Sequence, residues 1–275
     1  MTYMRLYDKI IIGRDKMEQD FLKIKELLLE YIKLILNNYS NCNRKKILNI
    51  INYDSEIIKF NSSSAISFVV RDGVLLLPKA AYQIFPLLKQ YKNYGAKPNS
   101  GRNIEDYLDT NTTYMEYINH VIEAGLSVYD YFEESLLHEA MHICGSQGGT
   151  PLEEGINELK TRELAQKCNI KIAAYGYSKE VEIAKRLQQI IGKELMDELT
   201  FIPSDERKKI IANKLGDREA ELYESISSIM KEKSASYYDK LLQVNDPFEK
   251  AKSYESVDYS EVYQIIDNYK RNNYR

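Results

Sequence analysis

The residues whose types and spacing could do chemistry are concentrated near the middle of the chain, between His138 and His142. This segment reads His-Glu-Ala-Met-His, an HExxH motif in which Glu139 follows the first histidine. On an α-helix, residues four apart differ by about 40° of rotation, so both imidazoles point the same way and can hold one Zn²⁺. Glu139 lies beside them, where its carboxylate can take a proton from a metal-activated water and pass it to a leaving group. The motif therefore predicts hydrolysis at a zinc ion.

The low histidine content makes this motif specific. The chain has 275 residues and only 3 histidines, of which the motif uses His138 and His142. In a chain of this composition, chance would produce HExxH about 0.003 times before any helical context is required. An isolated histidine is more often an ordinary core or surface residue. Because these two flank a glutamate at the correct spacing, we expect them to be metal ligands.

A hydrolytic zinc site needs a third protein ligand and an open fourth position. The metzincin pattern would need a histidine where this chain has Gly148. A ferritin-like di-iron site would need a second Glu-x-x-His pair, and neither His120 nor His138 has a glutamate at that spacing. The third ligand is therefore expected among the carboxylates. Glu154 and Glu158 lie at i and i+4 on one face of the next predicted helix, and both are candidates.

Two helices must position these side chains. The first is expected over 130–144, with Asp130 as its N-cap. The second is expected to begin with Thr150 as N-cap, Pro151 at the first helical position and Glu153 as the capping-box partner. Since the connection between them is short, we expect the helices to pack as an antiparallel pair with their polar faces meeting.

A family resemblance lies in the segment Leu152-Glu153-Glu154-Gly155-Ile156-Asn157-Glu158-Leu159. Together with HExxH it resembles the NEGxxEY-type segment of the gluzincins, the thermolysin-like clan of zinc metallopeptidases, over roughly residues 129–185. The resemblance implies a small bacterial zinc metalloendopeptidase that acts on a peptide or protein substrate. It also implies that His138, His142 and Glu154 bind zinc and that Glu158 orients a ligand histidine. A thermolysin-style alignment on Ile156-Asn157-Glu158 would instead make Glu158 the ligand.

Hydrolysis of a peptide bond on zinc usually needs a second electrophile that stabilises the tetrahedral intermediate. Our candidate is Tyr177, which follows Gly176 near the start of another predicted helix, and Tyr175 is the alternative. The chain contains 23 tyrosines, so an ordinary packing or surface role is the competing interpretation for both. We predict that Tyr177 is a catalytic residue.

The rest of the chain predicts an α+β fold that is mostly α. Two short β-rich runs and a turn predict a hairpin over 64–78, whose edge could bind a substrate backbone or whose side chains could simply close the core. Helical periodicity then continues almost to the end of the chain. We expect a zincin-like core, with a small β-sheet before the HExxH helix, and a helical C-terminal region. The subregions 1–62, 63–176 and 177–275 are expected to form one cooperative unit.

Composition restricts the partners and the compartment. The net charge of −3 lacks the Lys/Arg excess that nucleic-acid binding requires. Three cysteines without CxxC spacing favour free thiols in a reducing compartment, and neither a signal peptide nor a membrane span is recognisable. We expect a cytoplasmic protein without nucleic-acid or membrane partners, with non-classical export as an alternative and the oligomeric state open. The alternative function is a metal-binding, zincin-fold regulatory or partner-binding protein without proteolytic activity.

Overall fold

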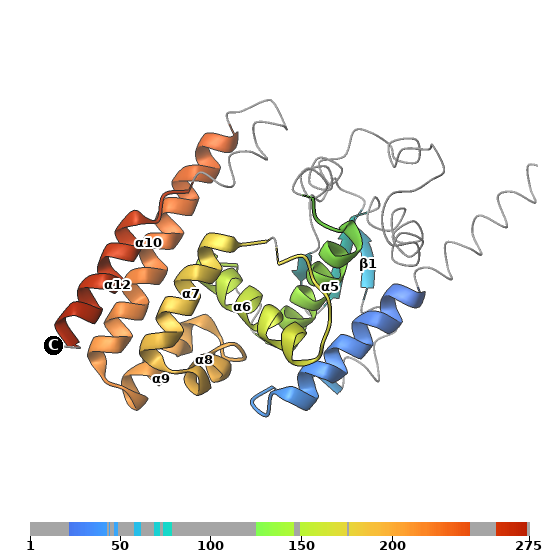
Figure 1. Ribbon diagram of the computed structural model, residues 1–275, viewed down its shortest axis with the longest axis horizontal. Coiled ribbons are helices and arrows are strands. Elements are labelled where there is room, and N and C mark those ends of the chain that lie inside the picture. The colour runs from blue at the N-terminus through green and yellow to red at the C-terminus, as the bar shows by residue number, and fades with distance from the viewer. Residues whose placement is uncertain are drawn as a thin grey trace, which may run out of the picture.

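The computed structural model describes the part of the chain that carries the candidate site and most of the C-terminal half. The described residues are 22–42, 44, 47, 48, 58–61, 69–71, 74–78, 125–145, 149–174, 176–242 and 257–273, the strands through their backbone alone. Helices joined by short turns make up most of this part (Figure 1). The division into the subregions 1–62, 63–176 and 177–275 stays a prediction.

A first apolar core forms between the helix over residues 22–38 and α5 (Val128–Cys144). Apolar residues recur every three or four positions in both helices, so each presents one apolar face to the other. Each fully buried Leu, Ile or Phe side chain contributes about 1.5–3 kcal/mol relative to exposure. This packing holds α5 by its apolar face. The fully buried members are Ile24, Leu28, Ile32 and Ile35 from the first helix and Phe132, Leu136, Leu137, Ala140 and Met141 from α5.

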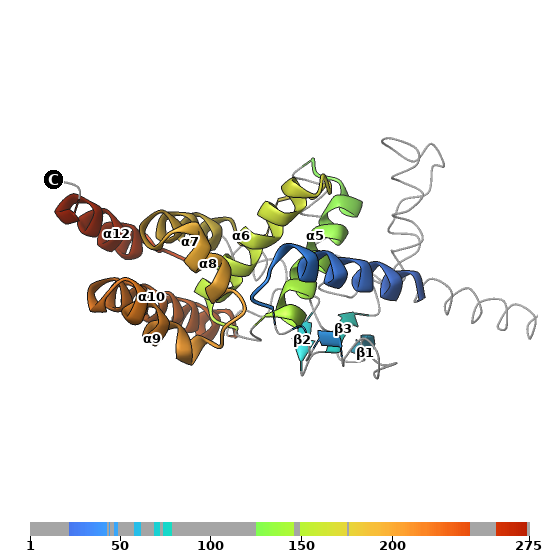
Figure 2. The same cartoon turned by 90° about the horizontal axis from the view of Figure 1, so that it is seen from below.

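A second apolar core joins α6 to the helices that follow it. Leu164 and Ala165 near the end of α6 belong to the first core, whereas Leu152 and Ile156 near its start belong to the second. Figures 1 and 2 accordingly show α6 in the middle of the molecule, between α5 and the later helices. These elements are α6 (Pro151–Lys167), α7 (Ser178–Ile191), α8 (Lys193–Leu199), α9 (Ser204–Lys214), α10 (Asp217–Leu242) and α12 (Ser260–Asn273).

The helices α6 and α7 cross closely because Gly155 has no side chain at their contact. A Cβ atom at Gly155 would lie 2.5 Å from the backbone oxygen of Glu180 and 2.6 Å from its carbonyl carbon. These distances are shorter than any real Cβ contact, so only glycine permits the two backbones to approach this far. The crossing therefore fixes where the first turn of α7 lies relative to the side chains of α6.

The α+β fold class predicted from the sequence is wrong, and the fold is corrected to a helical one. All residues with described side chains lie in helices or in the segments between them, and the described cores are built by helices. Strands are described through their backbone only, in three short pieces of 4, 3 and 5 residues. The candidate site accordingly lies on a pair of helices. The pieces are β1 (Ile58–Asn61), β2 (Val69–Arg71) and β3 (Val74–Pro78).

These strands pair in the order β1-β3-β2. The pairing of β2 with β3 is antiparallel, with Val70 opposite Leu75, and lies within the predicted hairpin. The strand β1 was not predicted and pairs in parallel with β3. The rest of the predicted hairpin lies outside the described residues, so its proposed role as a substrate-binding edge stays a prediction.

The helix α10 is the longest of the described helices, at 26 residues. With a rise of 1.5 Å per residue it extends over about 39 Å, which exceeds the thickness of a bilayer core. Charged residues, beginning with Asp217, Arg218 and Glu219, occur along its sequence. Among the described residues, no helix combines the length and the apolar character needed to cross a membrane.

Candidate metal centre

The helix α5 carries the HExxH motif and begins earlier than the sequence predicts. Its N-cap is Ser127 rather than Asp130, because the Ser127 hydroxyl accepts a hydrogen bond from the Asp130 backbone N–H at 3.2 Å. Asp130 instead lies in the first turn, where a negative charge suits the positive end of the helix dipole. The helix continues to Cys144, so His138 and His142 both lie on it, one turn apart.

The start of α6 is confirmed as the sequence predicts it. Thr150 is the N-cap and Pro151 the first helical residue. The Thr150 hydroxyl accepts from the Glu153 N–H at 3.3 Å, while the Glu153 carboxylate accepts from the Thr150 N–H at 3.0 Å. Arg207 of α9 lies 3.6 Å from the other oxygen of the same carboxylate. This first turn is therefore held from two sides, and Glu154 follows it directly.

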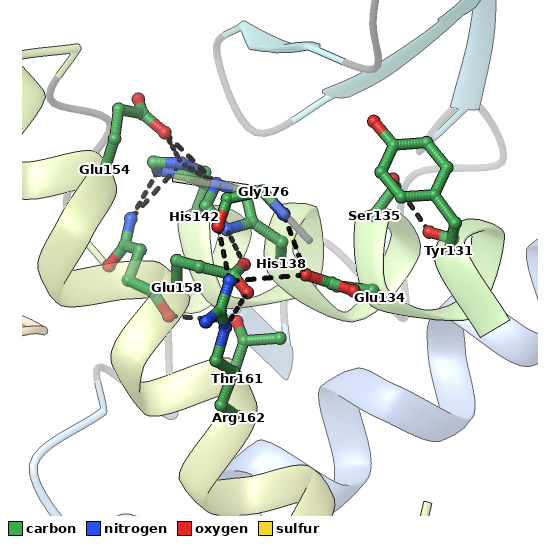
Figure 3. Close-up of polar contacts among 11 residues, drawn as sticks. Tyr131, Glu134, Ser135, His138, His142, Glu154, Glu158, Thr161, Arg162 and Gly176 are labelled. Atoms are coloured by element: carbon green, nitrogen blue, oxygen red, sulfur yellow. Dashed lines mark hydrogen bonds and ion pairs between the residues drawn. The ribbon is translucent and has the colours of Figure 1, made fainter. Parts of the chain in front are cut away.

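Three of the predicted metal ligands face one another across the two helices (Figure 3). The Nε2 atoms of His138 and His142 lie 3.1 Å apart. Oε2 of Glu154 lies 3.1 Å from Nε2 of His138 and 3.2 Å from Nε2 of His142. The side chains of both histidines are nearly buried, whereas the Glu154 side chain is 19% exposed. The three atoms thus form a nearly equilateral triangle, with Glu154 at its more open corner.

The dimensions of this triangle suit a tetrahedral zinc ion. Bonds of about 2.0–2.1 Å at tetrahedral angles place neighbouring ligand atoms about 3.3 Å apart. The three measured edges lie within about 0.2 Å of that value. When each histidine carries its proton on Nδ1, both Nε2 atoms and the Glu154 oxygen present lone pairs to one point. In these tautomers the three acceptors can share one cation, whereas a second proton on His138 lets its Nε2 donate to Glu154 instead.

Glu158 lies behind the triangle, on the far side of the His138 ring. Its Oε2 atom is 3.0 Å from Nδ1 of His138, and its side chain is 2% exposed. The other carboxylate oxygen accepts a hydrogen bond from Nε of Arg162 at 2.6 Å. A carboxylate in this position keeps the histidine proton on Nδ1 and leaves Nε2 free for a metal. Of the two candidate carboxylates, Glu154 is therefore the one that faces both Nε2 atoms.

Asn157 lies against the His142 ring and was not predicted from the sequence. Its amide nitrogen lies 2.7 Å from Nδ1 and 3.2 Å from Nε2 of His142, and the residue is 1% exposed. Asn157 is three residues after Glu154 and therefore shares its face of α6. That spacing was the signal that could have identified it.

Glu134 is a second residue that the sequence analysis missed. It precedes His138 by one helical turn, its side chain is 3% exposed, and it is hydrogen-bonded to Glu158. Its Oε1 atom accepts from the Gly176 N–H at 3.3 Å. Burial, together with the neighbouring charge of Glu158, raises the pKa of Glu134 from 4.5 to about 8. Glu134 therefore keeps a proton at neutral pH.

The electrostatics of the ligands follow from burial beside opposite partners. Burial alone would lower the pKa of His138, but hydrogen bonds to Glu154 and Glu158 outweigh it and raise that pKa well above its usual value. Burial would raise the pKa values of both carboxylates, and their contacts with the histidines hold these pKa values below the usual range instead. The site therefore contains two ionised carboxylates with a strong demand for a positive partner.

Of the two predicted catalytic residues, Tyr177 contacts a ligand histidine, and Glu139 is placed by its position on α5. Glu139 is buried on α5, directly after His138. Tyr177 is 43% exposed, and its ring stacks on the His138 ring with centroids 5.3 Å apart and planes 14° from parallel. The alternative residue, Tyr175, lies outside the described residues, as does His120.

The resemblance of this chain to a known family is carried by its own residues alone. A cluster of two histidines and a glutamate is compatible with several kinds of metal site, so the resemblance to the gluzincins stays a prediction. No protein-family model, no curated protein and no solved structure matches this chain.

Proposed function

We propose that this protein is a zinc-dependent metallopeptidase of the gluzincin type that cleaves peptide bonds within a peptide or protein substrate. The single observation that carries the proposal is the triangle of His138 Nε2, His142 Nε2 and Glu154 Oε2, with edges of 3.1–3.2 Å. The HExxH spacing supports it independently, because it supplies a base beside the two histidines.

The donor set favours zinc over other metals. Magnesium and calcium prefer sites built mainly from oxygen atoms, whereas two imidazoles and one carboxylate suit zinc. Three protein ligands leave one coordination position open, which hydrolytic sites require. When bound, zinc lowers the pKa of a coordinated water to about 7 and polarises a carbonyl oxygen. The partial exposure of Glu154 supports access from one side.

The residues of the chain then have separate roles in the proposal. Glu139 accepts a proton at its carboxylate and transfers it to the leaving amine. Glu158 orients His138 through Nδ1, the ring nitrogen that faces away from the metal, and Asn157 holds the His142 ring from its side. Tyr177 donates a hydrogen bond to the substrate oxygen where negative charge develops. Its contact with the His138 ring supports this role, since it keeps the tyrosine beside the ligand triangle.

The proposal also covers the surroundings of the protein. A net charge of −3 gives no support for a nucleic-acid partner. Cys42, Cys144 and Cys168 are free thiols, which supports a reducing compartment such as the cytoplasm. The substrate is accordingly a peptide or protein encountered there.

The test compares zinc content and peptide cleavage in three proteins. We expect wild-type protein to bind one zinc per chain and to cleave members of a peptide library in a chelator-sensitive reaction. His142→Ala should lose the zinc, whereas Glu139→Gln should keep it and cleave at least about 100-fold more slowly. A matched control is Glu224→Gln, an exposed position on α10.

Each outcome of this test has a definite meaning. Equal zinc content in wild-type and His142→Ala protein would contradict the metal site, and full activity of Glu139→Gln would contradict the proposed base. Zinc binding without any cleavage would contradict the peptidase and favour the metal-binding regulatory protein.

A further inference from the structure

The turn that leads into α7 has an unusual backbone. Tyr177 is the N-cap of α7 and has a left-handed conformation, with φ 54° and ψ 33°. For a residue other than glycine this conformation costs about 1–2 kcal/mol, and it persists when surrounding contacts hold it. The contacts of this turn therefore decide where the Tyr177 side chain lies.

Both polar backbone groups of the preceding residue, Gly176, are bound to side chains of the metal centre. The Gly176 N–H donates to Oε1 of Glu134 at 3.3 Å. The Gly176 carbonyl oxygen accepts a hydrogen bond from Nη2 of Arg162 (Figure 3). One bond thus comes from α5 and the other from α6, so the turn is attached to both helices of the site.

Arg162 also makes a second contact, through another nitrogen of its guanidinium group. Its Nε atom donates to Oε1 of Glu158 at 2.6 Å, and Oε2 of Glu158 faces Nδ1 of His138 at 3.0 Å. The Arg162 side chain is 19% exposed, and Glu158 beside it is 2% exposed. A planar guanidinium can hold two acceptors in fixed directions, which an ammonium group does not do. A continuous chain of polar contacts therefore leads from Gly176 through Arg162 and Glu158 to His138.

The turn also contacts His138 directly, through Tyr177. The Tyr177 ring stacks on the His138 ring at 5.3 Å. The close crossing at Gly155 and Glu180 places the first turn of α7 against α6, next to the site. The orientation of His138 and the position of Tyr177 are thus held by one closed set of contacts, in which Arg162 is the joining side chain.

We propose that Arg162 is a positioning residue that couples the metal ligand His138 to the turn bearing Tyr177. Zinc binding at His138 then fixes Tyr177 over the site, and by reciprocity a fixed turn strengthens zinc binding. This inference rests on the zinc binding proposed above, and it does not require that the protein cleaves peptides.

The chain offers a specific probe for this coupling. It contains no tryptophan, so Tyr177→Trp would introduce a single indole at the turn. We take this variant as the parent, titrate Zn²⁺ into the metal-free protein, and record tryptophan emission. A chromophoric chelator in competition gives the zinc dissociation constant independently. We expect a saturable change in emission with the same midpoint as zinc binding.

Two variants in the parent background then remove the coupling. Arg162→Gln removes both the positive charge and the planar guanidinium. Arg162→Lys keeps a positive charge beside Glu158 but cannot hold two acceptors in fixed directions. We expect each to lose most of the emission change and to bind zinc about 10-fold more weakly. Arg186→Gln is the matched control, because Arg186 also bonds to a glutamate four residues earlier but lies on α7 away from the turn. If circular dichroism shows that Arg162→Gln is unfolded, the coupling is judged from Arg162→Lys alone.

The outcomes separate this inference from the proposed function. An unchanged emission response and zinc affinity in the folded Arg162 variants would overturn the coupling, as would a parent that binds zinc without any emission change. A parent that binds no zinc would overturn both proposals. Zinc-dependent emission in the parent, together with a wild-type protein that binds zinc and cleaves no peptide, would uphold the coupling and overturn the peptidase.

Discussion

Two buried polar clusters lie along α6, and they differ in how their charges are satisfied. The first, which we call the lysine cluster, surrounds a lysine side chain that is completely buried. The second, which we call the metal cluster, surrounds the ligand triangle. Both clusters contain nearly or fully buried charged side chains of α6, so burial alone does not distinguish them. The lysine cluster consists of Lys160, Glu163, Gln188, Lys193 and Asp197, and the metal cluster of Glu134, His138, His142, Glu154, Asn157, Glu158 and Arg162.

The lysine cluster is complete in itself. The Lys160 ammonium lies 2.6 Å from Asp197 and 3.1 Å from Glu163, and it also bonds to Gln188. Lys193 approaches the same two carboxylates from the surface. Two lysines therefore face two carboxylates, and every buried charge has an opposite partner. This arrangement stabilises the packing of α6 against α7 and α8.

The metal cluster lacks such a balance. Two ionised carboxylates, Glu154 and Glu158, face one permanent cation, Arg162. The remaining positive charge must come from a proton on His138 or from a metal ion at the ligand triangle. A buried cluster therefore indicates a binding site when its ionised carboxylates outnumber its permanent cations and its acceptors converge on one point.

The largest predicted effect concerns the lysine cluster. Lys160→Met removes the buried ammonium and leaves Asp197 and Glu163 without it, so we expect the free energy of unfolding to fall by about 3–5 kcal/mol. Zinc affinity of the folded protein should not change. Chemical denaturation and zinc competition measure the two quantities. Lys193→Met is the control, because the Lys193 side chain is 54% exposed and its removal should cost less than about 1 kcal/mol.

The opposite result would remove the distinction between the clusters. If Lys160→Met weakened zinc binding as strongly as it weakened folding, the lysine cluster would belong to the metal site. If it left the free energy of unfolding unchanged, the cluster would not be the structural element described here.

The sequence predicts the parts of the site that depend on local spacing. His138 and His142 face one way because both lie on one helix, and Thr150 with Glu153 predicts the start of α6 because a capping box is a local pattern. The predicted N-cap of α5 is wrong by three residues. Ser127 and Asp130 are both good N-cap residues, and local sequence does not decide between them.

The parts that depend on distant contacts could not be predicted. The bond between Glu134 and Gly176 joins residues 42 positions apart, and nothing in either segment alone indicates it. The fold class failed for a related reason. The apolar β-branched run near Val70 predicts strands, and the strands are present, but helices elsewhere build the described cores.

The second prediction concerns Glu134, the protonated carboxyl group of the metal cluster. Between pH 4.5 and about 8, folded Glu134 holds a proton that the unfolded chain releases, so this residue makes the protein less stable as the pH rises. Glu134→Gln removes the titration and can still bond to Gly176 and Glu158. In metal-free protein, we expect the variant to gain about 1–3 kcal/mol over wild type between pH 5 and pH 8.

Denaturant unfolding at the two pH values checks this expectation. Glu224→Gln, which removes an exposed carboxylate from α10, should show no such pH-dependent gain. A stability difference between Glu134→Gln and wild type that is the same at pH 5 and pH 8 would show that Glu134 is already ionised in the folded protein.

The smallest predicted effect concerns the amide beside His142. The Asn157 nitrogen lies 2.7 Å from Nδ1 and 3.2 Å from Nε2 of His142, while the buried Asn157 Oδ1 atom has no hydrogen-bond partner among the described residues. When Nε2 of His142 binds a metal, its proton is on Nδ1, which then needs an acceptor. A half-turn of the amide exchanges its nitrogen and oxygen and brings the acceptor Oδ1 beside Nδ1. We therefore expect Asn157→Leu to weaken zinc binding about 10-fold and Asn157→Asp, which keeps an acceptor, to restore most of it. Equal affinity in wild-type and leucine variants would mean that His142 needs no such support, unlike His138 with its carboxylate.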